Sequence, residues 1–311
     1  MTTPAEYAPL AEALAGLDAL TRITERVLAG WPEHRDFLAM RFSGCDAEHL
    51  AFCESVARSL LAIAGDGLDR YADGYRWTCE RMLEEDYHFQ LTGEYRYRTF
   101  REVQDGLGLD AAYMTRYTDG LLLSQLLWVN QARALHLYVT GFLGAVREGE
   151  SLLEVGPGHG LLLALAVERA RARITGWDVS DGSVASTREA LARLGHTACL
   201  RRQDLHLAPA TERFDHVVAS ELLEHVDEPE AALRRLRDLV RPGGRLFVNI
   251  PVNSPAPDHI NLWRTPEEVS AYVREAGLEV LTEAVFPMTG CTEEEARATA
   301  STLSCVLICR A

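Results

Sequence analysis

The chain has 311 residues, a formal charge of −15 at pH 7 and a hydrophobic fraction of 47%, which predict a globular protein of about two domains. So acidic a protein is unsuited to bind DNA or RNA, because that binding depends on Lys and Arg neutralising phosphates. The sequence contains no lysine, which excludes Schiff-base chemistry and the Walker phosphate loop, both of which need a lysine amine.

Seven cysteines are scattered along the chain without a C-x-x-C pair, a pattern typical of reduced thiols rather than of a disulfide framework or a zinc site. The first residues show no basic segment followed by an apolar one, so we expect no signal peptide. No apolar run approaches the roughly 18 residues that a membrane helix needs. We therefore expect a cytoplasmic protein with no membrane partner.

The chain up to about residue 148 predicts one helix after another. Apolar residues recur at three-and-four spacing over residues 10–28, 50–63 and 71–82, as in helices with one buried face. Residues 121–143 are apolar almost all round, which indicates a helix buried on every side. Residues 1–148 are therefore predicted to form a helical domain.

From residue 149 onwards, short apolar strands alternate with amphipathic helices. Strands are predicted at 151–155, 174–179, 197–201, 214–219, 245–250, 278–286 and 302–309, and helices at 159–172, 183–194, 229–240 and 265–276. Such alternation predicts an α/β domain, over residues 149–311, whose parallel sheet is covered by helices on both faces.

The most specific motif joins the first of these strands to the helix that follows it. An acid, Glu154, is followed by Gly156, Gly158 and Gly160 in a G-x-G-x-G turn. Glycines let the backbone approach a ligand closely, and the N-terminus of the next helix favours negative charge. A dinucleotide-binding turn needs its third glycine one position later, where this chain has Leu161. The spacing therefore disfavours a nicotinamide oxidoreductase.

This spacing resembles motif I of the class I S-adenosylmethionine (SAM) dependent methyltransferases. Later motifs follow in the order of that family: Asp178 ends the second strand, Asp204 follows the third, and Arg-Pro-Gly-Gly at 241–244 precedes the fifth. The resemblance covers about residues 149–311. It implies a Rossmann-like class I methyltransferase sheet with a helical N-terminal domain.

The resemblance also implies which residues hold SAM. The three glycines would cradle its methionine end, and Glu154 would support the loop or the amino group. Asp178 would hold the ribose hydroxyls, since a carboxylate accepts two hydrogen bonds, Asp204 would hold the adenine, and Ser220 would be a further contact. Simpler interpretations are a tight turn for the glycines, a solvated strand end for Asp178 and a helix cap for Asp204.

Candidate residues for the methyl acceptor follow the fourth strand, in an E-x-x-E-H segment formed by Glu221, Glu224 and His225. The segment resembles that of ubiquinone-biosynthesis-type O-methyltransferases. It is also similar to small-RNA 2′-O-methyltransferases, in which these residues bind a divalent metal with a later histidine, here His259. In a helical turn the three side chains can converge, and carboxylates with imidazole suit Mg²⁺, Mn²⁺ or Zn²⁺. The alternative is a metal-free pocket, with His225, Glu224 or His259 acting as base or shaping the pocket.

The helical domain is predicted to cap the acceptor site. Aromatic residues are frequent between residues 71 and 128, and a closed, dry pocket would orient an organic acceptor. The cluster from Tyr87 to Tyr97 is our first expectation for substrate contact. By analogy with the family, the helical domain could also form a homodimer.

We therefore predict a SAM-dependent methyltransferase that acts on a small organic molecule, first of all on oxygen, in a biosynthetic pathway such as secondary metabolism. Alternatives are a C-methyltransferase acting on an activated carbon, a protein methyltransferase with an open groove, and a SAM-binding protein without catalysis. An RNA acceptor is disfavoured, because the chain is acidic and shows no basic groove with interleaved aromatics.

Overall fold

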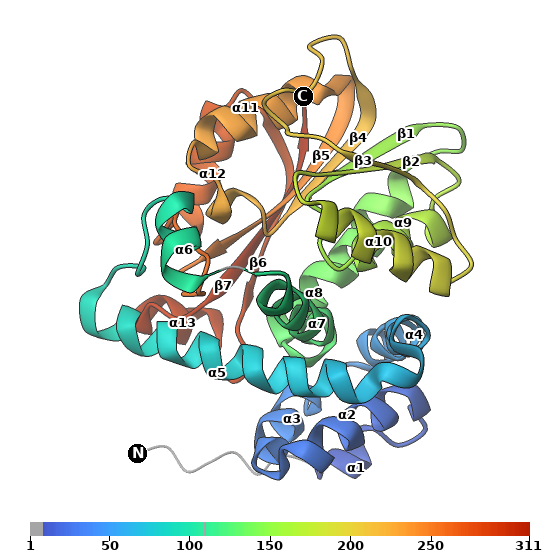
Figure 1. Cartoon of the computed structure of the whole chain (residues 1–311), viewed down its shortest axis with the longest axis vertical. Coiled ribbons are helices and arrows are strands. Elements are labelled where there is room, and N and C mark those ends of the chain that lie inside the picture. The colour runs from blue at the N-terminus through green and yellow to red at the C-terminus, as the bar shows by residue number, and fades with distance from the viewer. Residues whose placement is uncertain (1–8, 109) are drawn as a thin grey trace.

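The computed structural model describes residues 9–108 and 110–311. It places a layer of helices beneath a seven-stranded sheet (Figure 1). The strand order is β3-β2-β1-β4-β5-β7-β6. The strands are β1 (Ser151–Val155), β2 (Arg173–Asp178), β3 (Cys199–Arg202), β4 (Phe214–Ser220), β5 (Val240–Val252), β6 (Glu279–Pro287) and β7 (Leu303–Arg310).

The sheet is parallel from β3 to β5, whereas β7 pairs antiparallel with both β5 and β6. The prediction of a parallel sheet is therefore wrong for the last strand. The segment between β6 and β7, which contains α13 (Glu293–Thr299), turns back at the same end of the sheet. A parallel neighbour would instead need a crossover to the opposite end.

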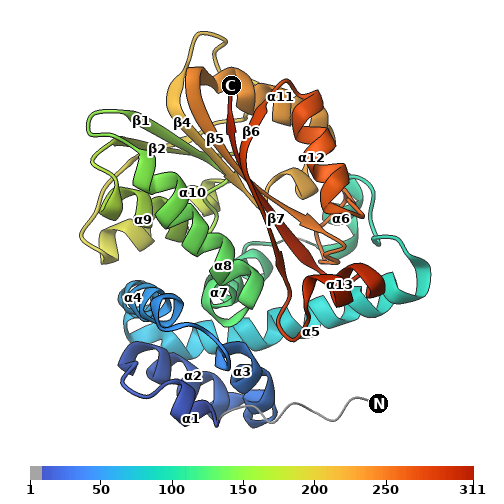
Figure 2. The ribbon, with the colours of Figure 1, turned by 180° about the vertical axis from the view of Figure 1, so that it is seen from behind.

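Helices cover both faces of the sheet (Figures 1 and 2). Those of the α/β part are α9 (Leu161–Arg169), α10 (Asp181–Arg193), α11 (Pro229–Leu239) and α12 (Pro266–Glu275). Successive strand residues point to opposite faces, so Leu152 and Val218 belong to one buried cluster, and Leu153 and Val217 to the other. The sheet thus separates two apolar cores.

The helical layer shares the first of these cores. Its helices are α1 (Leu10–Ala13), α2 (Asp18–Gly30), α3 (Arg35–Phe42), α4 (Ala47–Ala64), α5 (Leu68–Thr92), α6 (Phe100–Leu107), α7 (Ala111–Leu127) and α8 (Val129–Leu137). Leu20 of α2, Leu122 of α7 and Ile308 of β7 all lie in the same cluster. The layer therefore packs directly on one face of the sheet, while its separate role as a cap and dimerisation domain stays a prediction.

Two of the predicted helices are interrupted. Residues 14–17 separate α1 from α2, and Trp128 separates α7 from α8, where its backbone is extended (φ −109°, ψ 132°). A π-helical turn, Tyr138–Phe142, then follows α8. The break at Trp128 matters for function because it lies beside a cavity that Trp128, Asn130 and Gln131 help to line.

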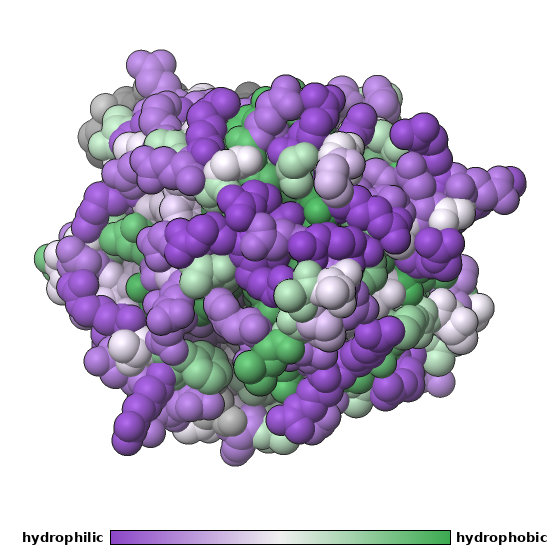
Figure 3. All heavy atoms as spheres, turned by 90° about the horizontal axis from the view of Figure 1, so that it is seen from above, coloured by the Kyte–Doolittle hydropathy of each residue, from purple (hydrophilic) through white to green (hydrophobic). Residues whose placement is uncertain are grey.

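Seen from above, the surface is mainly hydrophilic, and its hydrophobic residues form small patches (Figure 3). Within residues 9–108 and 110–311, no helix combines the length and hydropathy needed to cross a membrane. The prediction about a signal peptide concerns mainly residues 1–8, which lie outside the described residues.

Candidate functional site

A cavity of about 580 Å³ opens at the point where the order of the sheet reverses, between β1 and β4. In open α/β sheets, ligands bind outside the carboxyl ends of the strands at such a point. The residues after β1, from Gly156 to His159, form one wall, and Ser220 with Glu221 at the end of β4 forms another. From there the cavity extends to helices α5 and α7 of the helical layer.

The glycine turn has the backbone that its sequence predicts. Gly158 (φ +51°) and Gly160 (φ +80°) lie in the left-handed region, which L side chains rarely adopt. A Cβ atom on Gly160 would lie 2.9 Å from the Cα atom of Thr187 in α10, whereas a Cβ on Gly158 would meet nothing within 4 Å. The turn therefore packs closely against α10 and leaves open space on the cavity side.

Glu154 places a buried carboxylate at this end of the cavity. The residue is 3% exposed, and its Oε2 atom has no hydrogen-bond partner. Burial, with a smaller contribution from Asp178, raises the pKa of Glu154 to about 8. An unpartnered buried carboxylate needs a donor, so the ammonium of an amino-acid ligand, such as the methionine end of SAM, fits this position.

The two aspartates predicted to bind SAM lie outside the cavity lining. Asp178 accepts a hydrogen bond from the Ser180 amide at 2.8 Å, and Asp204 accepts one from the His206 amide at 2.7 Å. Neither aspartate lines the cavity, whereas Ser220 does. The roles of Asp178 and Asp204 in SAM binding stay predictions.

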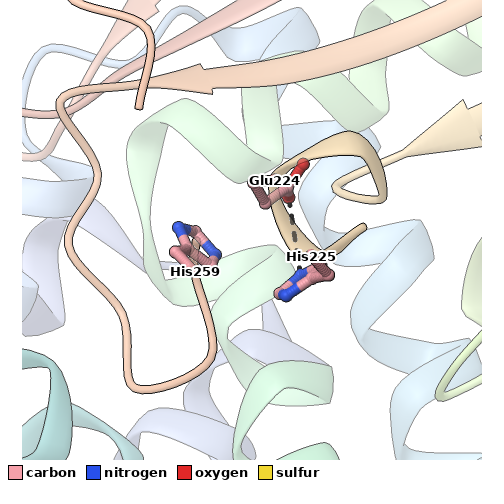
Figure 4. A group of neighbouring side chains, drawn as sticks. All are labelled: Glu224, His225 and His259. Carbon is pink, nitrogen blue, oxygen red and sulfur yellow. Dashed lines mark ion pairs between the residues drawn. The ribbon is translucent and has the colours of Figure 1, made fainter. Parts of the chain in front are cut away.

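The structure brings Glu224, His225 and His259 together (Figure 4). One ligand atom from each lies within 4.8 Å of the others, and the His225 Nε2 atom is 3.6 Å from Glu224 Oε1. Both carboxylate oxygens of Glu224 are buried without a hydrogen-bond partner. Burial and the nearby Glu221 raise the pKa of Glu224 well above its usual range. This arrangement of one carboxylate and two imidazoles can hold a divalent cation.

Backbone carbonyls orient both imidazoles. The Nδ1 atom of His225 lies 3.1 Å from the Asp258 carbonyl oxygen, and that of His259 lies 2.6 Å from the Ser254 carbonyl oxygen. A carbonyl can only accept, so each Nδ1 carries a hydrogen, and in a neutral ring Nε2 then keeps its lone pair. Metal-binding histidines are usually fixed by such a contact. Burial, with His225 nearby, lowers the pKa of His259 to about 4, which keeps its ring neutral.

Glu221 lies outside this three-residue group. Its backbone is left-handed (φ +50°), and the short turn Leu223–His225 begins only after it. The expectation that one helical turn makes all the side chains of the E-x-x-E-H segment converge is therefore wrong for Glu221. Its carboxylate instead accepts a hydrogen bond from Asn249 Nδ2 at 2.8 Å and lines the cavity. Burial raises the pKa of Glu221 to about 7.

Two tyrosines of the helical layer hold the loop that carries His259. The Tyr117 hydroxyl donates to Asp258 Oδ1 at 2.9 Å, and the Ser254 amide donates to the Tyr95 hydroxyl at 2.9 Å. Asp258 and Ser254 are the residues whose carbonyls orient His225 and His259. Sequence reasoning placed both tyrosines in an aromatic stretch but missed this role, since no local pattern connects them with the loop.

The far end of the cavity differs from the predicted substrate contact. Of the cluster from Tyr87 to Tyr97, only Gln90 lines the cavity, and Tyr87 is 69% exposed. The wall at this end is formed instead by Trp31, His34 and Phe37, together with Trp128. The first three precede the aromatic stretch that the sequence analysis considered.

In comparisons with known proteins, residues 153–246 match a family model described as "Methyltransferase domain". The ubiquinone biosynthesis O-methyltransferase of Aeromonas salmonicida is 33% identical over 105 residues, which cover 32% of this chain and 43% of the relative. That of Aromatoleum aromaticum is 31% identical over 158 residues, which cover 42% of this chain and 64% of the relative. Among solved structures, phosphoethanolamine N-methyltransferase 2 of Haemonchus contortus has a TM-score of 0.49 at 12% identity, covering 68% of this chain and 60% of that chain.

The matched region leaves much of each protein uncovered. The chain spans 43% of the Aeromonas relative and 64% of the Aromatoleum relative. The family match begins in β1 and ends in β5. It thus contains the glycine turn and the E-x-x-E-H segment, and the helical layer lies outside it.

Proposed function

We propose that this chain, which contains a class I SAM-dependent methyltransferase domain similar to that of ubiquinone biosynthesis O-methyltransferases, transfers a methyl group to a hydroxyl oxygen of a small organic molecule in a biosynthetic pathway. One observation carries the proposal: the glycine turn, His225 and His259 line the same cavity. That the chain forms a homodimer through its helical layer, and that it is cytoplasmic, stay predictions.

SAM would supply a methyl group bound to a sulfonium sulfur. The acceptor attacks the methyl carbon in line with the carbon–sulfur bond, and the sulfur leaves. The protein's part is to hold the two reactants in that alignment, from which most of the rate gain comes. The glycine turn offers the space and Glu154 the acceptor for the amino-acid end. Val179 and Leu207, next to the two predicted aspartates, are 60% and 77% exposed apolar side chains, and they offer surface that an adenosine group would cover.

A hydroxyl acceptor must lose its proton as the methyl group arrives. His225 lines the cavity and its side chain is 28% exposed, with Nε2 available as a proton acceptor. Its orientation is fixed through Nδ1 by the Asp258 carbonyl. Without a bound metal ion, His225 is therefore the group of this chain best placed to take the proton.

We also propose that Glu224, His225 and His259 hold a divalent metal ion. Such an ion would lower the pKa of a bound acceptor hydroxyl. Two imidazoles and one carboxylate favour Mn²⁺ or Zn²⁺ over Mg²⁺, which prefers oxygen ligands. The unpartnered oxygens of Glu224 support this proposal, because a buried carboxylate without a cation or donor is costly.

Calorimetry of the purified chain with S-adenosylhomocysteine, alongside metal analysis of the same sample before and after EDTA, tests the proposed function. We expect micromolar binding of S-adenosylhomocysteine and near-stoichiometric metal. His259→Ala should lose the metal and keep the binding of S-adenosylhomocysteine, whereas His196→Ala, at a half-buried residue outside the cavity lining, should keep both.

The outcomes separate the alternatives. Binding of S-adenosylhomocysteine without any metal would overturn the metal site, leave His225 as a base, and favour methylation of carbon as much as oxygen. Binding without methyl transfer to any phenol tested with labelled SAM would favour a non-catalytic SAM-binding protein. Absence of binding would overturn the assignment as a SAM-dependent enzyme.

A further inference from the structure

The end of the cavity remote from the glycine turn is walled by stacked rings. The ring centroids of Trp31 and His34 lie 3.9 Å apart with an interplanar angle of 14°, and those of His34 and Phe37 lie 4.5 Å apart at 21°. All three residues line the cavity. They come from the end of α2, the short turn Pro32–His34 and the first turns of α3, so one short segment supplies a continuous aromatic wall.

A buried tyrosine fixes this wall. The Tyr75 hydroxyl lies 3.0 Å from His34 Nε2 and accepts a hydrogen bond from Trp128 Nε1 at 3.2 Å. Burial lowers the pKa of His34 to about 4, so the ring is neutral and its Nε2 can accept a hydrogen bond from the Tyr75 hydroxyl. The hydroxyl thus joins two rings of the cavity wall. A ligand meets rings that are already held in place, which lowers the entropy lost on binding.

Carboxyl groups line the cavity, and no permanently cationic side chain accompanies them in the described part of its lining. Among the described residues that line it, Asp86, Glu154 and Glu221 carry carboxylates and none is an arginine, and the chain has no lysine. Away from the proposed metal ion, an acceptor bearing a carboxylate or phosphate would leave water to face carboxyl groups without a cationic side chain to pair with. Burying an unpaired charge is strongly unfavourable, so the lining disfavours an anionic acceptor.

The size of the cavity allows an extended ring system. Its volume of about 580 Å³, part of which the methionine end of SAM would fill, is well above the roughly 150 Å³ that suffices for one benzene molecule in an apolar protein cavity. Besides the aromatic wall, the lining includes Met82, Leu121 and Met288. Aromatic rings prefer offset-stacked or edge-to-face contact with other rings, which a planar ligand can make here and a puckered one cannot.

From these observations we infer that the cavity segment walled by Trp31, His34, Phe37 and Trp128 binds an uncharged, planar aromatic ring system of the methyl acceptor. The acceptor class is therefore a neutral phenol with more than one ring. Its hydroxyl would face His225 and His259, and its remaining ring would lie against the stacked wall. This inference rests on the proposed function, because it assigns the substrate class of the same cavity.

Three probes of similar size test the inference on the full chain saturated with S-adenosylhomocysteine. Calorimetry would compare 2-naphthol with 6-hydroxy-2-naphthoate, which adds a carboxylate, and with decahydro-2-naphthol, which is saturated and puckered. We expect 2-naphthol to bind at least about tenfold more tightly than either analogue, because the first analogue adds an unpaired charge and the second loses ring stacking. Equal or tighter binding of either analogue would overturn the inference.

A pair of tryptophan variants localises the binding. Trp31→Leu should weaken 2-naphthol binding about tenfold and leave the affinity for S-adenosylhomocysteine unchanged. Trp77→Leu is the matched control, since Trp77 is also half-buried in the helical layer but does not line the cavity. Unchanged 2-naphthol affinity in Trp31→Leu would overturn the placement. Loss of S-adenosylhomocysteine binding by the unmutated chain would instead count against the proposed function, so the two failures are distinguishable.

Discussion

The two ends of the cavity are built on opposite principles. At the end formed by the sheet, Glu154 and Glu224 are buried with unpartnered oxygens, and burial raises the pKa of each. At the end formed by the helices, the polar atoms of Tyr75, His34 and Trp128 satisfy one another, and the surface is mainly aromatic. Unsatisfied buried groups are tolerated where a ligand completes them. The sheet end is thus built for chemistry, and the helical end for selecting the acceptor.

Glu224→Gln should have the largest effect, because it removes the only carboxylate of the proposed metal group. Mn²⁺ binding, measured by electron paramagnetic resonance, should weaken by at least about a hundredfold, more than is usual when a residue supporting a ligand is lost. In EDTA the melting temperature should barely change. The raised pKa keeps Glu224 protonated without a cation, and glutamine resembles the protonated acid in shape.

Glu230→Gln is the control for this substitution, because Glu230 is an exposed carboxylate in the first turn of α11. It should change neither Mn²⁺ binding nor melting. If Glu224→Gln kept its affinity for Mn²⁺, the three-residue group would not be the metal site. The sheet end of the cavity would then bind no metal ion, and in this respect it would not differ from the helical end.

Tyr117→Phe should have the next largest effect, since it tests whether the helical layer contributes to the sheet end. Loss of the hydroxyl leaves Asp258 without the 2.9 Å hydrogen bond that holds it beside His225. We expect an approximately tenfold weaker affinity for Mn²⁺ with unchanged affinity for S-adenosylhomocysteine. A purely structural role would lower both affinities together.

Tyr113→Phe is a matched control for Tyr117→Phe. Tyr113 lies one helical turn earlier on α7, and its hydroxyl is buried without a hydrogen-bond partner. Its removal should therefore affect neither affinity. Equal effects of the two substitutions would mean that packing in α7, rather than the bond to Asp258, supports the site.

The sheet end is also the part that the sequence predicts well. Glu154 and the glycine turn form one short segment and the E-x-x-E-H residues form another, and each segment lies at the end of a strand whose apolar run is easily recognised. Parallel strands bring such ends to one edge of the sheet, so local patterns are enough to place these residues near each other. The exception is Glu221, whose left-handed backbone no spacing rule anticipates.

The helical end was not predictable in the same way. Trp31, His34 and Phe37 lie more than a hundred residues before the glycine turn, and their spacing of three residues is also that of an ordinary buried helix face. They reach the cavity only because the helical layer packs on one face of the sheet. The break at Trp128 was missed for a related reason: the apolar residues continue through it, and the hydrogen bond to Tyr75 that accompanies it is made with a distant helix.

Tyr75→Phe should lower the free energy of unfolding and so test whether the helical end is internally satisfied. The substitution leaves Trp128 Nε1 and His34 Nε2 without the partner that each now has. An unsatisfied buried donor or acceptor costs about 1–3 kcal/mol, so urea unfolding should show a loss of this size. A loss near zero would mean that the cavity supplies other partners, and the contrast between its two ends would weaken.

Glu154→Gln should show itself as a change in the pH dependence of the free energy of unfolding. The pKa of Glu154 is raised from 4.5 to about 8 in the folded chain. Between these values the folded state keeps a proton that the unfolded state has released. The resulting contribution to stability is complete below about pH 4.5 and is lost as the pH rises through about 8.

Glutamine cannot titrate, so the free energy of unfolding in EDTA should fall less between about pH 5 and about pH 9 in Glu154→Gln than in the unmutated chain. The exposed Glu148→Gln should keep the full decrease. Saturation with S-adenosylhomocysteine should reduce the decrease in the unmutated chain, because an ammonium beside Glu154 would stabilise its charged form. If the ligand leaves the pH dependence unchanged, the unpartnered oxygen of Glu154 does not meet the amino group, and this carboxylate strains the sheet end without binding the ligand.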